Sequence, residues 1–196
     1  MPELTIYYDN PTPPSDTYLK YLQADCGKCD IQTKVVTNYE DWTAEGHQHE
    51  LYLEPTKDDR ISALKNNSKN VDIPSATAQG IYNYITTNYP TREKVIMVIG
   101  RGLVGKQLLD MLINYGYTVF EFNSASKKHL LSSIAFAYAD IIVGLATEEI
   151  FDQHFCDNWL NKKVLIDSGN NFNTKNKLRC GKWTRQVIVE RAGIQV

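Results

Sequence analysis

The chain has 196 residues, of which 42% are hydrophobic and 22% charged, and its formal net charge is −2. These values are typical of a soluble globular protein with one substantial domain, or one domain and a small partner. They argue against nucleic-acid binding, which favours a basic surface, and no apolar run approaches the roughly 18–20 residues of a membrane span. The N-terminus lacks the pattern of a secretory signal, so we expect a cytoplasmic protein without a membrane partner.

Residues 1–73 predict a small α/β lobe. We expect short strands at residues 4–8, 33–39 and 49–55. Between the first two, Ser15 is a candidate N-cap for a helix that runs to about Cys26, with Tyr18 and Leu22 on one face. The polar stretch 56–70 is expected to be a loop with at most one amphipathic helix. These elements fit a small lobe because so little chain cannot build a large core.

The four cysteines are Cys26, Cys29, Cys156 and Cys180. The spacing of the first two suits half a zinc site or a redox pair, but a zinc site needs two more ligands at comparable spacing. A redox pair is expected where a helix begins after a strand, whereas this pair follows the end of a predicted helix. We therefore expect ordinary reduced thiols and no metal site, with metal or redox chemistry as the lesser alternative.

Residues 74–196 alternate between strand and helix patterns. Strands are expected at 94–100, 117–122, 140–146 and 163–169, and helices at 75–89, 103–116 and 129–138. Continuous apolar runs such as "KVIMVIG" are typical of strands buried on both faces of a parallel sheet. The alternation predicts an α/β fold, a Rossmann-type doubly wound parallel sheet that serves as an NAD(P)-binding domain.

The stretch "GRGLVG" contains a G-x-G-x-x-G pattern between a predicted strand and a predicted helix, which is the context that gives the pattern its meaning. Gly100 would allow the tight turn, Gly102 the approach of a pyrophosphate, and Gly105 the close packing of helix on strand. Leu103 and Val104 complete the helix N-terminus on which phosphates would rest. The alternative is a small-residue turn that only packs a helix.

The end of the second strand distinguishes NAD from NADP. An NAD site usually has an acidic residue there, whereas this chain has Asn123 and Ser124 at the tip and Glu121 inside the strand. Arg101 and two lysines just beyond the tip suit a 2′-phosphate. The charges therefore favour NADP, although Glu121 could bind the ribose of NAD if the strand ends one residue earlier.

The segments "VIMVIGRGLVGK", "TVFEFNSAS", "ADIIVGLA" and "KVLIDSGNN", in this order and spacing, resemble the cofactor domain of the methylene-tetrahydrofolate dehydrogenase/cyclohydrolase family. Upstream, "SATAQGI" resembles the family motif that opens the helix before this domain. The resemblance covers about Ser75 to Gly181. It implies that Arg101 and Ser124 contact the 2′-phosphate of NADP, that Ala146 lies at the cofactor, and that the protein is a homodimer.

The N-terminal lobe resembles the family less. The family motif S-x-x-Y-x-x-x-K is matched at Ser15 and Tyr18, but Leu22 stands at the lysine position. The resemblance implies that Tyr18 lines a folate pocket and that Asp72 is the pterin-binding carboxylate. As alternatives, Tyr18 belongs to the core and Asp72 caps a turn. The glycine-rich loop of the family's active site has no counterpart near the C-terminus.

These features favour an NADP-dependent oxidoreductase that acts on a folate-like small molecule by hydride transfer. Cyclohydrolase activity is doubtful, because a leucine cannot transfer a proton where the family uses a lysine. The alternative is a non-catalytic dinucleotide-binding protein, a sensor or partner-binding module. A weaker alternative is a dehydrogenase for another small substrate.

Overall fold

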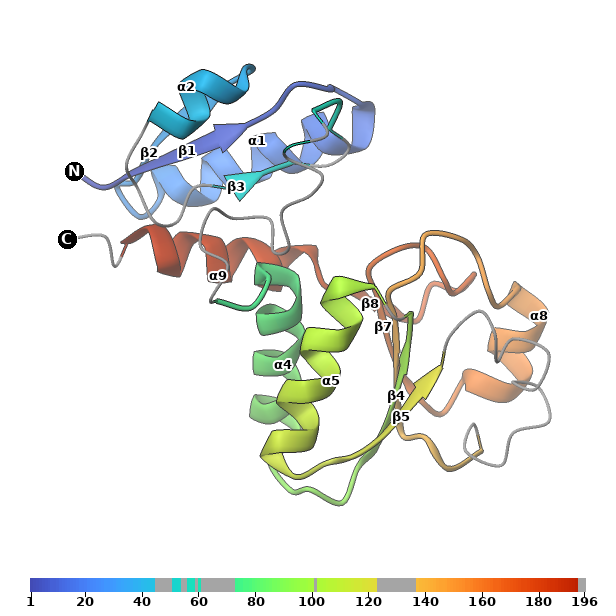
Figure 1. The fold of residues 1–196 in the computed structure, drawn as a ribbon. Coiled ribbons are helices and arrows are strands. Elements are labelled where there is room, and N and C mark those ends of the chain that lie inside the picture. Colours follow the sequence, from blue (N-terminus) through green and yellow to red (C-terminus); the bar gives the residue numbers. More distant parts are fainter. Residues whose placement is uncertain are drawn as a thin grey trace. The chain divides into compact units, whose positions relative to one another are not determined.

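The computed structural model describes residues 1–44, 51–53, 56–58, 60, 73–100, 102–122 and 137–193. The chain forms two compact units, which we call unit 1 and unit 2 (Figure 1). Unit 1 comprises Met1–Ala76 and Trp183–Val196, and unit 2 comprises Thr77–Lys182. Each unit is built on its own parallel sheet, so the predicted α/β class is confirmed.

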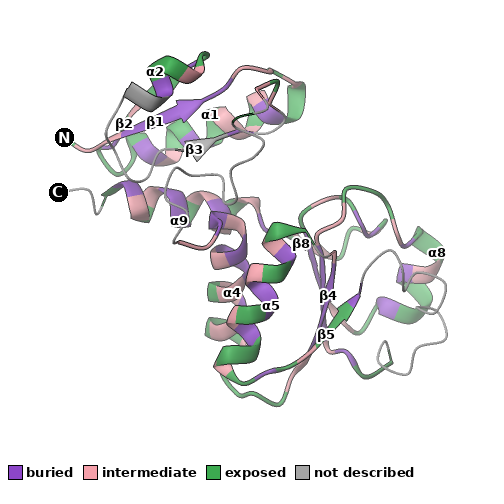
Figure 2. Cartoon of the chain, viewed as in Figure 1, coloured by how far each residue is buried: buried purple, intermediate pink, exposed green. Residues whose placement is uncertain are grey.

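Unit 1 contains a three-stranded parallel sheet in the order β2-β1-β3. The strands are β1 (Glu3–Tyr7), β2 (Gln32–Val36) and β3 (Leu51–Tyr52). The central strand β1 is buried on both faces, as its apolar sequence requires. Leu4, Ile6 and Tyr8 belong to one core, whereas Tyr7 packs against Trp42 on the opposite face, with ring centroids 5.9 Å apart (Figure 2).

Among the described residues, three helices cover this sheet: α1 (Pro13–Gly27), α2 (Tyr39–Ala44) and α9 (Gly181–Gly193). α1 contributes Leu22 and Cys26 to the core beneath β1, and both are fully buried. α9 adds Val187, Ile188 and Ala192 to the same core. The helix α2, which carries Trp42, packs on the other face. The small lobe is thus a three-layer α/β unit.

Unit 1 corrects the predicted start of α1. Ser15 is not the N-cap of α1: Thr12 is, and Ser15 occupies the third helical position, where the two side chains form a capping box. The helix begins earlier because Pro13 and Pro14 fit its first turn, where no N–H partner is needed. Residues 181–193, which the sequence analysis included in the nucleotide-binding domain without predicting a helix there, form α9, and its Val187, Ile188 and Ala192 belong to the core of unit 1.

Unit 2 contains a five-stranded parallel sheet in the order β5-β4-β6-β7-β8. The strands are β4 (Val95–Ile99), β5 (Thr118–Phe122), β6 (Ile141–Gly144), β7 (Val164–Asp167) and β8 (Lys177–Arg179). Four of them were predicted, and β8 was not, because three residues with two charges carry no strand pattern. The chain enters the sheet at β4, next to the edge strand, moves outward to β5, and returns to β6 on the other side of β4. This reversal is typical of the Rossmann fold.

Helices lie on both faces of this sheet (Figure 1). They are α4 (Ala76–Asn88), α5 (Leu103–Tyr115), α8 (Gln153–Phe155) and the π-helical turn η2 (Cys156–Leu160). α5 ends at Gly116, which has φ 104° and accounts for the helix stop. Met97, Ile99, Ile142 and the η2 residue Leu160 form the core on one face. The predicted helix at 129–138 lies mostly outside the described residues.

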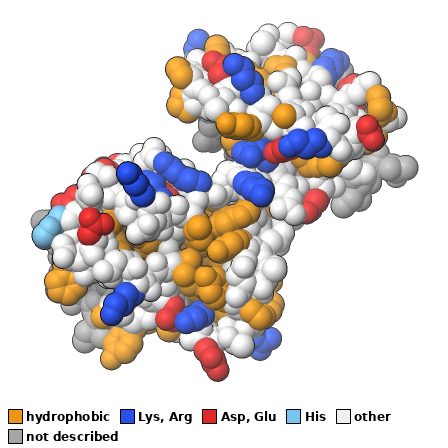
Figure 3. Space-filling view, turned by 180° about the vertical axis from the view of Figure 1, so that it is seen from behind, with side chains coloured by type: hydrophobic (Ala, Val, Ile, Leu, Met, Phe, Trp, Pro, Cys, Tyr) orange, Lys and Arg blue, Asp and Glu red, His pale blue; other side chains and the backbone are white. Residues whose placement is uncertain are grey.

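The surface of unit 2 exposes a group of hydrophobic side chains on one face, bordered by Lys and Arg side chains (Figure 3). Within the described segments, no helix is long and apolar enough to cross a membrane. The same segments hold no cluster of three or more His, Cys, Asp or Glu residues that could bind a metal ion. All four cysteines are free thiols, and burial raises the pKa of Cys26 to about 11.

Candidate dinucleotide-binding site

The turn from β4 to α5 has the geometry that its glycines predict. Gly100 has φ 110°, a conformation that L-residues with side chains avoid, and its N–H donates to Phe122 O on β5 at 2.9 Å. A Cβ on Gly105 would lie under 3.0 Å from Gly100 O, so only glycine allows the helix to start this close to the turn. Both positions are therefore restricted to glycine by backbone geometry.

The N-terminus of α5 has no side-chain cap. Gly102 is its N-cap and supplies no side-chain acceptor, and among the described residues, apart from its chain neighbours, no atom lies within 4 Å of the point where a Cβ on Gly102 would stand. The first turn also contains no acidic side chain. The N–H groups at Leu103, Val104 and Gly105, which a helix leaves without intrahelical partners, could therefore bind the phosphates of a dinucleotide.

The loop after β6 lies against this turn. Leu145 N donates to Ile99 O at 2.9 Å, and a Cβ on Gly100 would stand 3.2 Å from Ala146 N. Ala146, assigned to the cofactor by resemblance, is thus next to the first glycine of the turn. Because β4 and β6 are parallel neighbours, both loops leave the same edge of the sheet, where α/β proteins bind ligands.

Asn171, which the sequence analysis did not single out, holds that loop in place. Its fully buried side chain donates from Nδ2 to Ala146 O at 2.8 Å and to Glu148 O at 2.6 Å. Asn171 fits only because β6 ends in Gly144, where a Cβ would lie 2.5 Å from Asn171 Oδ1. The motif "KVLIDSGNN" contained this asparagine, but its partners are more than twenty residues away in the chain.

A buried carboxylate organises the loop after β7. Asp167 Oδ1 accepts from Asn171 N at 2.9 Å and from Gly169 N at 3.2 Å. Its Oδ2 forms an ion pair with Lys177 Nζ at 2.9 Å, and the carboxylate is fully buried. A Cβ on Gly169 would lie under 3.0 Å from Ala146 O. The loops after β6 and β7 are therefore locked together beside the glycine turn.

Several residues predicted for the site lie outside the described residues. These are Arg101, Asn123 and Ser124, which were assigned to the nucleotide, and Asp72, which was assigned to the pterin. Their roles stay predictions, and with them the preference for NADP over NAD. Glu121 is exposed on β5, one residue before the buried Phe122 that ends the strand.

In unit 1, the helix α1 brings Tyr18 and Leu22 to one face, as their spacing predicts. Leu22 is fully buried, so the position of the family lysine belongs to the core. Tyr18 is partly buried against that core, and the guanidinium carbon of Arg185 on α9 lies 5.7 Å from its ring centroid. Arg185 was missed in the sequence because its partners lie on a helix about 160 residues earlier.

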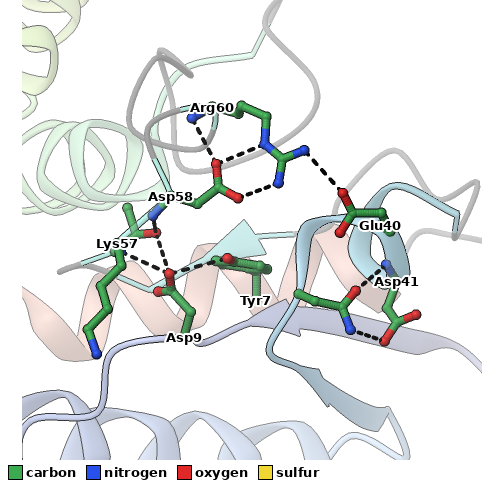
Figure 4. Close-up of polar contacts among 9 residues, drawn as sticks. Tyr7, Asp9, Glu40, Asp41, Lys57, Asp58 and Arg60 are labelled. Atoms are coloured by element: carbon green, nitrogen blue, oxygen red, sulfur yellow. Dashed lines mark hydrogen bonds and ion pairs between the residues drawn. The ribbon is translucent and has the colours of Figure 1, made fainter.

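The carboxyl end of β1 carries a network of polar side chains (Figure 4). Asp9 Oδ2 accepts from Tyr7 Oη and Thr56 Oγ1, both at 3.2 Å, and from Lys57 N at 2.9 Å. Burial, assisted by the neighbouring Asp9 carboxylate, raises the pKa of Tyr7 to about 12. This network fastens residues 56–58 to the loop between β1 and α1.

Arg60 extends the same network toward α2. Its guanidinium pairs with Asp58 at 2.7 Å and with Glu40 at 3.1 Å, and it lies 3.9 Å from the ring centroid of Tyr39 (Figure 4). The carboxyl end of this sheet is thus occupied by side chains that bind one another. It differs in this respect from the glycine-lined edge of unit 2.

The fold resembles that of NAD(P)-dependent dehydrogenases. The dehydrogenase-cyclohydrolase of Trypanosoma brucei, solved with NADP cofactor and an inhibitor, has 15% identity and a TM-score of 0.72, over 98% of this chain and 85% of that one. The NAD-dependent 5,10-methylenetetrahydrofolate dehydrogenase of Saccharomyces cerevisiae has 14% identity and the same TM-score, over 98% and 86%. These two neighbours use different dinucleotides.

A second group of dehydrogenases shares the fold. The shikimate dehydrogenase of Aquifex aeolicus has 13% identity and a TM-score of 0.56, over 97% of this chain and 96% of that one. No protein-family model and no curated protein sequence matches the chain. At these identities the likeness establishes the fold, while substrate and activity rest on the residues of the site.

Proposed function

We propose that this protein is an NADP-dependent oxidoreductase related to the methylene-tetrahydrofolate dehydrogenases. In this reaction a hydride passes from the methylene carbon of 5,10-methylene-tetrahydrofolate to NADP, so the substrate is oxidised to the methenyl form and the cofactor is reduced to NADPH. NAD is the alternative cofactor. The proposal includes unit 2 as the dinucleotide-binding domain, unit 1 as the substrate lobe, and a homodimer as the working assembly.

The open N-terminus of α5 carries this proposal. It combines a glycine N-cap, a Cβ position on that glycine that no described residue beyond its chain neighbours approaches within 4 Å, and a helix start that only Gly105 permits. A turn that served packing alone would not need the space at Gly102. The loop at Ala146, held by Asn171, adds a second wall at the same edge of the sheet.

The residues of the chain would bind and orient the reactants, because a nicotinamide cofactor itself accepts the hydride. The first-turn N–H groups of α5 would bind phosphate, and Tyr18 would line the substrate pocket. A cyclohydrolase step is not included. The side chain at the lysine position, Leu22, is buried in the core of unit 1 and has no group that donates or accepts a proton.

A thermal-shift titration of NADP and NAD, with and without tetrahydrofolate, tests the proposal. A ligand that binds only the native state raises the melting temperature. We expect a shift with NADP that grows when the folate is added, followed by NADPH formation at 340 nm when 5,10-methylene-tetrahydrofolate is supplied. The absence of a shift with either nucleotide would refute the proposal.

The variant Gly102→Asp makes this test specific. Its carboxylate can cap α5, so the stability should stay equal or rise by a few tenths of a kcal/mol, about 0.3. The same carboxylate occupies the phosphate position, and NADP binding should weaken at least about tenfold, or roughly 1.4 kcal/mol. Gly27→Ala is the matched control, because its Cβ also meets nothing within 4 Å but lies at the end of α1.

A non-catalytic dinucleotide-binding protein is the second candidate. It is favoured by the buried Leu22, which stands where the resembling family has a proton-transferring lysine. Both candidates bind the nucleotide, and only the enzyme forms NADPH. Nucleotide binding without turnover on methylene-tetrahydrofolate would therefore select the binding protein, or a dehydrogenase for another small substrate.

A further inference from the structure

Arg185 on α9 is held in a fixed position against α1. Its Nε donates to Asp25 Oδ2 at 2.8 Å. Its guanidinium carbon lies 5.7 Å from the ring centroid of Tyr18 and 5.2 Å from that of Tyr21. The side chain is only 15% exposed. One charged hydrogen bond and two aromatic contacts therefore restrain a side chain that would otherwise be flexible.

The two terminal nitrogens of this guanidinium are still available. Within the described part of the chain, Nη1 and Nη2 of Arg185 make no hydrogen bond or ion pair with another residue. Part of the Arg185 side chain, 15%, is exposed to solvent. A restrained guanidinium whose two NH2 groups have no partner among the described residues is preorganised for a planar anion.

The charges around Arg185 leave an excess of one positive charge. Asp25 is shared by two cations, Arg185 and Lys28, whose Nζ lies 3.0 Å from Asp25 Oδ1. The hydrogen bond from Arg185 is the main cause that lowers the pKa of Asp25, and the hydrogen bond from Lys28 is the second. The Asp25 carboxylate therefore stays ionised at neutral pH. Two cations and one carboxylate match a monoanion.

We propose that the terminal nitrogens of Arg185 bind the carboxylate of a small organic molecule, whose flat apolar part rests on Tyr21 and Tyr18. A carboxylate fits because its two oxygens accept the parallel N–H groups of a guanidinium. Tyr21 supplies an aromatic surface that is 58% exposed. This inference rests on the proposed function, because it takes the bound molecule to be the substrate. It restricts the substrate to molecules that carry a carboxylate.

An NMR titration of the full chain with benzoate tests this site. Two control ligands are titrated in parallel. Benzamide has the same shape as benzoate without the charge, and inorganic phosphate is an anion without the flat ring. The readout is the Nε–Hε signal of Arg185 and the Kd derived from it. We expect millimolar binding of benzoate that shifts this signal, with benzamide and phosphate each at least tenfold weaker. Equal binding of benzamide, or tighter binding of phosphate, would overturn the proposal.

Two variants and one control locate the charge. In Arg185→Gln, benzoate binding should weaken at least tenfold. The backbone amide signals monitor the binding in this variant. In Arg185→Lys, which retains the charge without the planar fork, it should weaken several-fold. Lys20→Gln removes an exposed cation of the same helix that does not pair with Asp25, and it should change the Kd less than threefold. Unchanged binding in Arg185→Gln would refute the site; if that variant fails to fold, Arg185→Lys and benzamide still decide.

The same samples separate this inference from the proposed function. Benzoate binding at Arg185 without any NADP binding would refute the oxidoreductase and leave a carboxylate-binding protein. NADP binding with no benzoate effect at Arg185 would refute the carboxylate site and leave the dinucleotide site intact.

Discussion

The two units each contain a turn that leads from a central strand into a helix, and the two turns have opposite chemistry. At the start of α1, the Thr12 side chain caps the helix, prolines occupy its first positions, and Asp16 adds a negative charge. At the start of α5, the cap is a glycine without a side chain, and the first turn holds neither proline nor acid. One helix N-terminus is thus closed to anions and the other is open.

This difference shows that a parallel sheet followed by a helix does not by itself make a phosphate site. The N–H groups of α1 are removed by proline or used by Thr12, while Tyr8 and Ser15 fill the turn with hydrogen bonds. The first N–H groups of α5 receive no side-chain cap. In unit 1, the groups that could bind an anion at this turn instead stabilise the start of the helix.

The largest effect is expected from Leu22→Lys, which restores the lysine of the resembling family. Because Leu22 is fully buried, the substitution places an unpaired charge in the core of unit 1 and should cost about 3–5 kcal/mol of the free energy of unfolding. Urea denaturation measures this loss. Gln23→Lys, at the exposed neighbouring position, should be nearly neutral. A stable Leu22→Lys variant with cyclohydrolase activity would show that this face of α1 lines a pocket.

Gly105→Ala should have the next largest effect. The added methyl group would lie under 3.0 Å from Gly100 O, which is backbone and cannot rotate away. We expect a loss of about 2–3 kcal/mol from overpacking, together with loss of NADP binding. Urea denaturation measures the loss of stability, and a thermal-shift titration with NADP measures the loss of binding. Stability equal to that of Gly27→Ala would mean that α5 can move away from its turn.

Changing the two helix caps tests the comparison directly. Thr12→Ala removes the acceptor for Ser15 N and should destabilise unit 1 by about 1 kcal/mol without affecting NADP binding. Gly102→Asp should do the reverse, with stability retained and nucleotide binding lost. If Thr12→Ala weakened NADP binding as much as Gly102→Asp does, the two turns would not act independently.

The smallest effect concerns the pair formed by Asp25 and Arg185. The pKa of Asp25 is lowered in the folded protein, so the pair stabilises above the unfolded value of about 4 and is lost as the pH falls through the lower folded value. The stability difference between the wild type and Arg185→Gln should shrink between pH 7 and pH 3, by less than about 1 kcal/mol for a partly exposed pair. A difference independent of pH would exclude this ion pair as its source.

Much of unit 2 could be predicted because its signals are local. Four of its strands are short apolar runs, and the roles of Gly100 and Gly105 follow from a spacing within one turn. α2, α8 and α9 were missed for the opposite reason. α2 and α8 are too short to display a period, and α9 carries the β-branched run Val187–Val189, which is typical of a strand.

The sequence by itself determined the glycine turn between β4 and α5, the parallel α/β class and the absence of a proton-transferring side chain at position 22. Each of these depends on residues that lie close together in the chain. Only the tertiary structure decided that α9 completes the core of unit 1, that Asn171 holds the loop at Ala146, and that Arg185 meets Asp25. These contacts join distant residues, and no periodicity or local motif records which distant side chains will satisfy each other's hydrogen bonds and charges.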